Sequence, residues 1–234
     1  MKHEISQQFI PLENQQKIHA DIFMDRITAK IIINGNWTKV SRKESCNNFL
    51  EDPRYFWWNM LNTHTSNDNK ILNIGTCSPP SRRDETITFI APDSYTEMDI
   101  NKKKSPDIVG DVTNPPESLS ASFDRVLFFG VLPFLDNPAN YLNISKVLKP
   151  GGKILIGAAA SDSYRGFEQD SRFPIWRPDK GSLTQYKKQM NQPVLRWSFD
   201  LKSFELLFSD YWKNIKYEKA GHCWFAVGEK NENL

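Results

Sequence analysis

The sequence predicts an α/β fold in which a mostly parallel sheet is covered on both faces. Two apolar runs, at residues 125–129 and 153–158, read as buried strands. Between them, the apolar residues of segment 138–148 recur at helical spacing. A sheet that is covered on both faces needs nearly continuous apolar strands joined by helical crossovers. This pattern therefore indicates a parallel α/β sheet.

Composition limits the class of protein. A chain of 234 residues with 39% hydrophobic and 12% aromatic residues is long and apolar enough for one globular domain with additions. The net charge of +2 gives no overall field for nucleic acid or an anionic membrane, so we expect neither partner. Cys46, Cys77 and Cys223 are scattered, which favours reduced thiols. No signal peptide or run of about 20 apolar residues is evident, so we expect a cytoplasmic protein.

The N-terminal segment, residues 1–69, is polar and mixed, and we expect it to form a cap packed on the core. Residues 28–33 read as a strand that ends at the turn signal Asn34-Gly35. A helix is expected over residues 45–61, interrupted by Pro53. The aromatic cluster at 55–58 either anchors this cap to the core or forms a wall of a ligand pocket.

The core is expected to begin with the strand 70–75. An apolar strand that ends in glycine presents backbone N–H groups to a ligand beyond the carboxyl edge of the sheet. The next strand closes at Asp99, 24 residues after Gly75 and near the interval of about 20 at which a carboxylate accepts ribose hydroxyls. Asp111 and the neighbouring Val112 N–H offer the acceptor and donor that an adenine edge requires.

Residues 123–135, followed by the LKPGG turn at 148–152, resemble the second half of a class I S-adenosylmethionine-dependent methyltransferase. In that family an FDxV strand precedes such a turn. The family's glycine loop has three glycines after an acid, whereas residues 73–79 keep only Gly75, and Asn73 replaces the acid. The resemblance implies a Rossmann-like three-layer sandwich over residues 70–234, whose seven-stranded, mostly parallel sheet has an antiparallel last strand. It also implies S-adenosylmethionine as cofactor.

The resemblance places the cofactor at the carboxyl ends of four strands. The expected contacts are Asn73, Gly75, Thr76, Asp99, Ile100, Asp111, Val112, Phe129 and Gly130, with Met98 and Ile100 beside the adenine. Simpler interpretations are a strand-end turn residue for Asp99 and a plain turn for Gly130. The incomplete glycine loop argues more strongly against a dinucleotide than against S-adenosylmethionine. The pyrophosphate of a dinucleotide must approach the backbone very closely, whereas S-adenosylmethionine has no phosphate.

Beyond the strand 153–158, the chain inserts residues 161–196, rich in aromatic and polar side chains. Loops after strand carboxyl ends carry substrate specificity in α/β enzymes, so we expect the acceptor here. Earlier, Asp136 or Asn137 is expected to cap the helix after the central strand. Asp200 is expected to cap the helix that follows the insert. The apolar side of that helix would be buried by Phe204, Leu206, Leu207 and Tyr211. A final hairpin, 215–219 with 223–227, completes the sheet.

Methyl transfer to oxygen or nitrogen can need a base, in addition to alignment of the reacting groups. His222, in the hairpin turn, has the best expected location, and Asp162, just past a central strand, is the second candidate. The simpler interpretations are a packing histidine and a solvated carboxylate. No strong metal motif is evident, although Asp162, Glu168 and Asp170 could gather around a divalent ion.

Three functions from different classes fit these observations. We favour a methyltransferase that acts on a small molecule or glycan, by O-methylation of a hydroxyl, because the insert combines aromatic and polar groups. The lost glycines and Asn73 suggest, as an alternative, an inactive binding or scaffold protein of the same fold. The run Lys102–Lys104 faintly suggests an NAD(P)-dependent oxidoreductase, although Asp99 would repel a 2′-phosphate.

Overall fold

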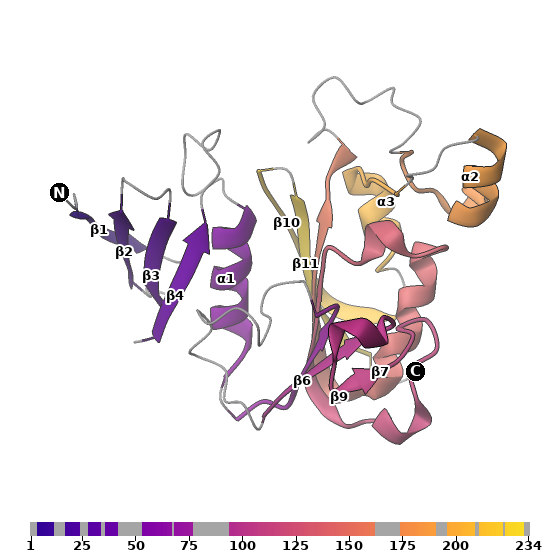
Figure 1. Cartoon of the computed structure of the whole chain (residues 1–234), viewed down its shortest axis with the longest axis horizontal. Coiled ribbons are helices and arrows are strands. Elements are labelled where there is room, and N and C mark those ends of the chain that lie inside the picture. The colour runs from indigo at the N-terminus through magenta and orange to yellow at the C-terminus, as the bar shows by residue number, and fades with distance from the viewer. Residues whose placement is uncertain are drawn as a thin grey trace.

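The computed structural model describes eleven segments of the chain (Figure 1). They are residues 4–11, 17–23, 28–33, 36–41, 53–66, 68–76, 94–161, 174–190, 196–208, 211–221 and 223–231. These segments form two sheets, one of four strands and one of seven. The candidate site lies on the larger sheet.

The four-stranded sheet is antiparallel throughout. Its strands β1 (Glu4–Pro11), β2 (Lys17–Phe23), β3 (Thr28–Ile33) and β4 (Asn36–Ser41) lie in sequence order. The strand expected over residues 28–33 is confirmed with the same bounds. It pairs with β4 from Ile33 opposite Asn36, as the Asn-Gly turn signal predicts for a hairpin.

The seven-stranded sheet has the order β10-β11-β9-β8-β5-β6-β7. Its strands are β5 (Ile71–Ile74), β6 (Tyr95–Asp99), β7 (Ile108–Val109), β8 (Phe123–Phe129), β9 (Leu148–Ala159), β10 (Trp212–Ala220) and β11 (Cys223–Lys230). The pairings from β7 to β9 are all parallel, and β11 runs antiparallel to both of its neighbours. The predicted mostly parallel sheet with an antiparallel last strand is confirmed.

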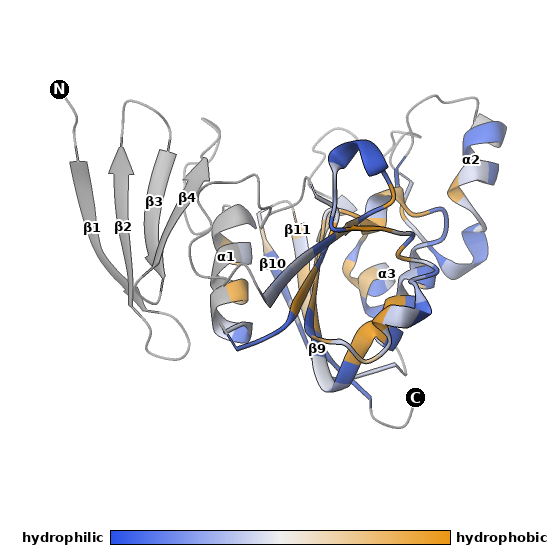
Figure 2. Ribbon diagram, turned by 60° about the horizontal axis from the view of Figure 1, so that its bottom comes forward, coloured by the Kyte–Doolittle hydropathy of each residue, from blue (hydrophilic) through white to orange (hydrophobic). Residues whose placement is uncertain are grey.

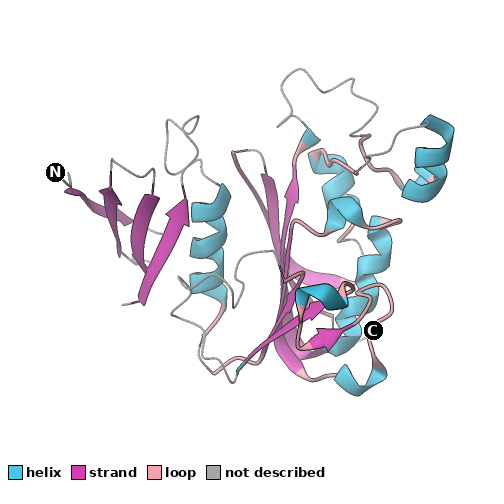
Figure 3. Cartoon of the chain, viewed as in Figure 1, coloured by secondary structure: helices cyan, strands magenta, loops and turns pink. Residues whose placement is uncertain are grey.

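Helices cover both faces of this sheet, which gives the three layers of the predicted fold (Figures 1 and 3). Helix α1 (Pro53–His64) lies against one face. The opposite face is covered by the ten-residue 3₁₀ helix η6 (Pro138–Val147) and by α3 (Leu201–Leu206), with the short helix α2 (Leu183–Met190) further out. Hydrophobic residues concentrate on the strands and on the helical sides that meet them (Figure 2).

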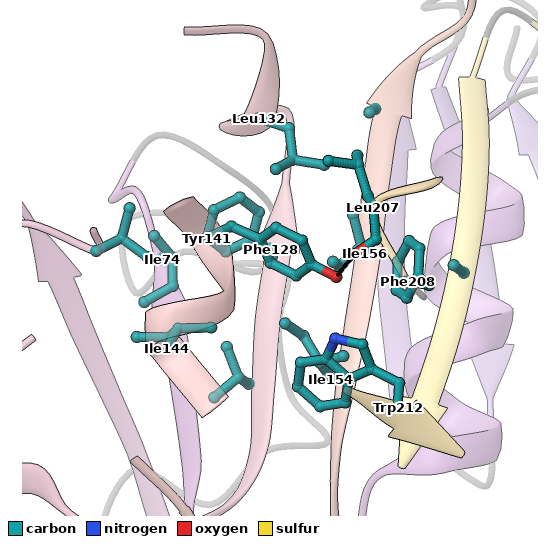
Figure 4. Close-up of a cluster of buried hydrophobic side chains, with 14 of the residues drawn as sticks. Ile74, Phe128, Leu132, Tyr141, Ile144, Ile154, Ile156, Leu207, Phe208 and Trp212 are labelled. Carbon is teal, nitrogen blue, oxygen red and sulfur yellow. Dashed lines mark hydrogen bonds between the residues drawn. The ribbon is translucent and has the colours of Figure 1, made fainter. Parts of the chain in front are cut away.

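The core between the sheet and η6 is built mainly from aromatic and branched side chains (Figure 4). Phe128 and Ile156 project from neighbouring strands towards Tyr141 of η6, and all three are fully buried. The Tyr141 hydroxyl donates a hydrogen bond to the Leu207 carbonyl at 2.8 Å. This bond satisfies a polar group that burial would otherwise make costly, and it ties η6 to the end of α3.

On the other face, an aromatic stack joins α1 to the sheet. The ring centroid of Trp57 lies 5.0 Å from that of Phe129 and 6.2 Å from that of Phe225, and Trp57 is completely buried. Phe56 lies 4.8 Å from Phe225. Gly157 lies beneath the stack, where an added Cβ would come within 2.3 Å of Phe129 Cδ2. Of the two interpretations of the aromatic cluster, Phe56 and Trp57 therefore support anchoring to the core.

Several local expectations are corrected by the structure. Residues 45–52 of the expected helix lie outside the described residues, and Pro53 is the first residue of α1 as described, where a proline without an N–H fits the first helical turn. The segment after Asn137 forms a 3₁₀ helix, although Asn137 does cap it by accepting a bond from Ala139 N–H at 3.1 Å. Leu206 and Tyr211 are 41% and 42% exposed, contrary to expectation, because α3 is only six residues long. Phe204 of α3 and Leu207, which follows it, are buried as expected.

Strand β9 also begins earlier than expected, since its LKPGG sequence is part of the strand. Leu148 pairs with Phe123, and the register between the two strands shifts before Arg125 pairs with Lys153. Gly151, with φ of 69°, lies within this irregularity, a conformation that favours glycine.

Candidate active site

The first wall of the site is the end of β5. Gly75 has φ of 88°, a value that glycine adopts readily, and its N–H donates to the Met98 carbonyl at 2.8 Å. Asn73 is fully buried within the strand, and its side-chain amide reaches the Gly75 carbonyl at 3.4 Å. The single remaining glycine of the loop therefore stands where the chain turns away from the sheet.

Asp99 closes β6 directly beside this turn. Its Oδ2 accepts hydrogen bonds from the N–H and the hydroxyl of Thr76, both at 3.1 Å. Its Oδ1 accepts one from Asn101 N–H at 2.8 Å. A carboxylate has about four acceptor positions, and the chain itself occupies three of them. One acceptor position on Oδ1 has no recorded hydrogen bond within the described residues.

Asp111 follows β7 on an exposed turn. Its Oδ1 accepts bonds from the N–H and hydroxyl of Thr113, both at 2.8 Å, while no bond of Oδ2 is recorded in the described structure. Val112 is 6% exposed and packs in the core, which fixes the turn in place. The Gly110 N–H donates to the Asp99 carbonyl at 3.1 Å, so the Asp99 and Asp111 ends of the edge are joined.

Ile100 and Met98, the two residues expected beside the adenine, differ in their exposure to solvent. Ile100 is 70% exposed at the end of β6 and is free to cover a ligand. Met98 is 1% exposed and contributes to the core, so the expectation that it flanks the adenine is wrong. Successive strand residues face opposite sides, and the register that places Asp99 at the edge turns Met98 inward.

Phe129 and Gly130 form the end of β8. The Phe129 ring is engaged with Trp57 and Phe225, so its packing is accounted for by the core. Gly130 has φ of 72°, and an added Cβ would meet nothing within 4 Å, which leaves open space beside it. The structure thus brings Gly75, Asp99, Asp111 and Gly130 to the carboxyl ends of neighbouring parallel strands.

Asp136 is a residue whose role the sequence did not reveal. Instead of capping the next helix, its Oδ1 accepts a bond from Thr184 N–H at 2.7 Å, at the start of α2. Its carbonyl accepts one from Leu183 N–H at 2.7 Å and one from the Trp197 indole at 3.3 Å. Burial by itself raises the pKa of Asp136, but the bonds from Thr184 and Ser182 outweigh it and lower the pKa below its usual value. The loop after β8 is therefore fastened to the insert.

The far end of the insert is held by an ion pair. The Arg177 guanidinium binds both carboxylate oxygens of Asp200, with one N–O distance of 3.0 Å. Asp200 also caps α3 as predicted, accepting from Ser203 N–H at 2.8 Å. Partial burial raises the pKa of Asp200, and the bonds from Arg177 and Ser203 reverse this and lower it. The described part of the insert is thus held at two places, at Arg177 by Asp200 and at Thr184 by Asp136.

Both expected catalytic residues, His222 and Asp162, lie outside the described residues, as do Glu168 and Asp170. Their described neighbours are placed. Cys223 pairs with Ala159, so the turn between β10 and β11 lies at the carboxyl edge of the parallel strands, beside Ser161. Within the described segments, no group of three or more His, Cys, Asp or Glu side chains could hold a metal ion. None of the helices described has the length and hydropathy needed to cross a bilayer.

Asp99 and Asp111 place hydrogen-bond acceptors at this edge, which is the chemistry that the sequence-based prediction requires for ribose hydroxyls and an adenine amino group. Beside Gly130 an added Cβ would meet nothing within 4 Å. Lys102–Lys104 form the exposed 3₁₀ helix η3, capped by Asn101, but the Asp99 carboxylate is close to it in the chain and disfavours a 2′-phosphate.

The sequence and the fold were compared with those of known proteins. Residues 79–156 match the family model described as "Methyltransferase domain". The structure is similar to the PH0226 protein from Pyrococcus horikoshii, with a TM-score of 0.54 and 18% identity over 80% of this chain and 94% of that one. It is also similar to an S-adenosylmethionine-dependent methyltransferase from Methanosarcina mazei, with a TM-score of 0.50 and 15% identity over 73% and 96%. No curated protein matches the sequence.

The matched family segment includes Asp99, Asp111 and Gly130, so it covers most of the edge described above. The strand order with its reversed β11 agrees with the fold of these structures. The match over residues 79–156 identifies a methyltransferase domain within the chain, with S-adenosylmethionine as its cofactor.

Proposed function

We propose that this methyltransferase acts on a small molecule or glycan and transfers the methyl group to a hydroxyl oxygen. The observation that carries the proposal is the pairing of Cys223 with Ala159. Cys223 directly follows His222, and Ala159 precedes Asp162 by three residues, so the two candidate bases follow or adjoin paired strand ends in the chain. A hydroxyl is a weak nucleophile, and a base within reach of it is what O-methylation needs in addition to alignment.

In this proposal the cofactor residues hold and orient, while His222 or Asp162 accepts the proton of the acceptor hydroxyl. Asp99 and Asp111 fix the nucleoside, and the segment anchored at Asp136 and Asp200 closes over the acceptor. S-adenosylmethionine, when bound, supplies an electrophilic methyl group on its sulfonium. The near-neutral net charge of +2 supports a small acceptor over a nucleic acid.

The experiment measures transfer of isotope-labelled methyl from S-adenosylmethionine to a panel of phenols, sugars, amines and thiols. We expect product with hydroxyl acceptors. For His222→Gln or Asp162→Asn, whichever residue is the base, kcat should fall about 10²–10⁴-fold, while the Kd for S-adenosylhomocysteine stays unchanged. His64→Gln, which changes a histidine on α1, is the matched control and should keep full activity. Product only with amines or thiols would contradict the proposal.

A further inference from the structure

The turn after β8 exposes a large aromatic side chain at the cofactor edge. Leu132, Pro133 and Phe134 form the 3₁₀ turn η5 (Leu132–Phe134). Leu132 and Pro133 are buried, whereas Phe134 is 62% exposed. Burial of an aromatic ring stabilises a fold, so the exposure of this ring by itself contributes nothing to the stability of the chain.

The exposed ring stands on a turn that is fixed by hydrogen bonds. Within the turn, Phe134 N–H donates to the Val131 carbonyl at 2.9 Å. From the segment that directly follows the insert, Trp197 N–H donates to the Pro133 carbonyl at 2.9 Å. Asp136, two residues further on, accepts from the first turn of α2. The turn is therefore held from both sides, and Phe134 is presented on a rigid support.

The position of Phe134 relates it to the acceptor and not to the cofactor contacts. It lies four residues beyond Gly130, past the four strand ends that carry the cofactor residues. The insert that we expect to carry the acceptor is fastened to Asp136, two residues beyond this turn, through Leu183 and Thr184. Phe134 thus lies where the post-β8 loop and the acceptor-side segment meet.

We propose that Phe134 is a specificity-determining residue that contacts the acceptor, and that the acceptor presents an aryl face to this ring. The inference rests on the proposed function and narrows its substrate class from hydroxyl compounds in general to aryl alcohols and phenols. Stacked or edge-to-face aromatic pairs add to the free energy of area burial, which explains the use of phenylalanine at this position.

The test is a binding titration that needs no turnover. Saturation-transfer NMR measures the Kd of 2-naphthol and of methyl glucoside with the full chain, with and without S-adenosylhomocysteine. We expect 2-naphthol to bind more tightly than methyl glucoside. Phe134→Ala should weaken 2-naphthol binding about tenfold, since it removes one aromatic pair together with its buried area. Phe134→Tyr should retain most of the binding.

Leu206→Ala is the matched control, because Leu206 is also partly exposed but lies on α3 and not on the turn after β8. Its 2-naphthol affinity should equal that of the unchanged protein. Equal losses in both variants, tighter binding of the glucoside, or no binding of 2-naphthol would overturn the inference. Failure of S-adenosylhomocysteine to bind in the same samples would instead count against the proposed function, so the two failures are distinguishable.

Discussion

The carboxylate of Asp124 and the ammonium of Lys149 form an ion pair of 2.9 Å across the starts of β8 and β9. The other carboxylate oxygen of Asp124 accepts the Lys70 N–H at 2.8 Å, one residue before β5. A single side chain therefore links the beginnings of the three central strands. These residues are the acid of the FDxV strand and the lysine of the LKPGG sequence, so a pattern that suggested a methyltransferase also has a direct structural role.

Asp124 should make the protein sensitive to acid. Partial burial raises the pKa of Asp124, but the bonds from Lys149 and from Lys70 N–H prevail and lower it. Because the folded-state pKa lies below the unfolded one, the stabilisation is present above about pH 4 and is lost as the pH falls through the lowered value. Asp124→Asn should lose about 1 kcal/mol in urea unfolding at pH 7. The exposed Asp179→Asn should lose nothing measurable, and an equal loss there would exclude this role of Asp124.

Gly157→Ala should destabilise the sheet by about 1–3 kcal/mol, because the new Cβ would overlap the rings of Phe129 and Phe225. Thermal unfolding monitors the loss. Phe129→Leu in the same chain should relieve part of it, so the double variant should be less destabilised than the sum of the single ones. If the losses of unfolding free energy in the two single variants simply add in the double variant, the new Cβ does not clash with the Phe129 ring.

The two partners of the Thr76–Asp99 contact should differ in their effect on the cofactor. Asp99→Ala removes acceptor positions for the ribose and should weaken S-adenosylhomocysteine binding several-fold to about a hundredfold in calorimetry. Thr76→Val removes only the hydroxyl that occupies Asp99 Oδ2 and should leave the affinity unchanged or higher. Equal weakening by both would mean that Asp99 acts by holding the loop and does not contact the ribose.

His64 should lower stability in mild acid. Burial, followed by the charges of Lys153, Lys216 and Arg125, lowers the pKa of His64 to about 4. Between about pH 6.5 and 4 the unfolded chain binds the proton and the folded chain does not, so stability falls as the pH decreases through this window. His64→Gln should show a shallower decline of Tm over the same range. Parallel Tm profiles for the two proteins would contradict this assignment.

Much of the large sheet could be predicted from the sequence, because its strands are continuous apolar runs and the FDxV and LKPGG patterns resemble a known family. Gly75, Asp99 and Asp111 were identified because each ends a strand, and the ends of parallel strands meet at one edge. That they act on the cofactor is still a prediction. The buried position of Met98 was missed, since the alternation of faces depends on a register that a five-residue strand does not define.

The role of Asp136 shows what local patterns cannot provide. Aspartate and asparagine are both good helix caps, so the sequence predicted that either Asp136 or Asn137 caps the helix that follows. In the structure Asn137 takes that position, and Asp136 binds Thr184, 48 residues away. Propensities and caps describe neighbours in the chain, whereas this contact exists only after the insert has folded back. The ion pair between Arg177 and Asp200 likewise joins residues that are 23 positions apart in the chain, so no local pattern predicts it.

The strand order has a consequence for how the chain folds. β5 is completed at Ile74, but one of its two neighbours, β8, begins only at Phe123. During synthesis, one edge of β5 must therefore wait for about fifty further residues, and closing so long a loop slows the pairing. Until β8 arrives, the apolar strand β5 is open to wrong partners on a nascent chain. β8, which pairs with both β5 and β9, therefore joins the sheet only after β5, β6 and β7 have been synthesised.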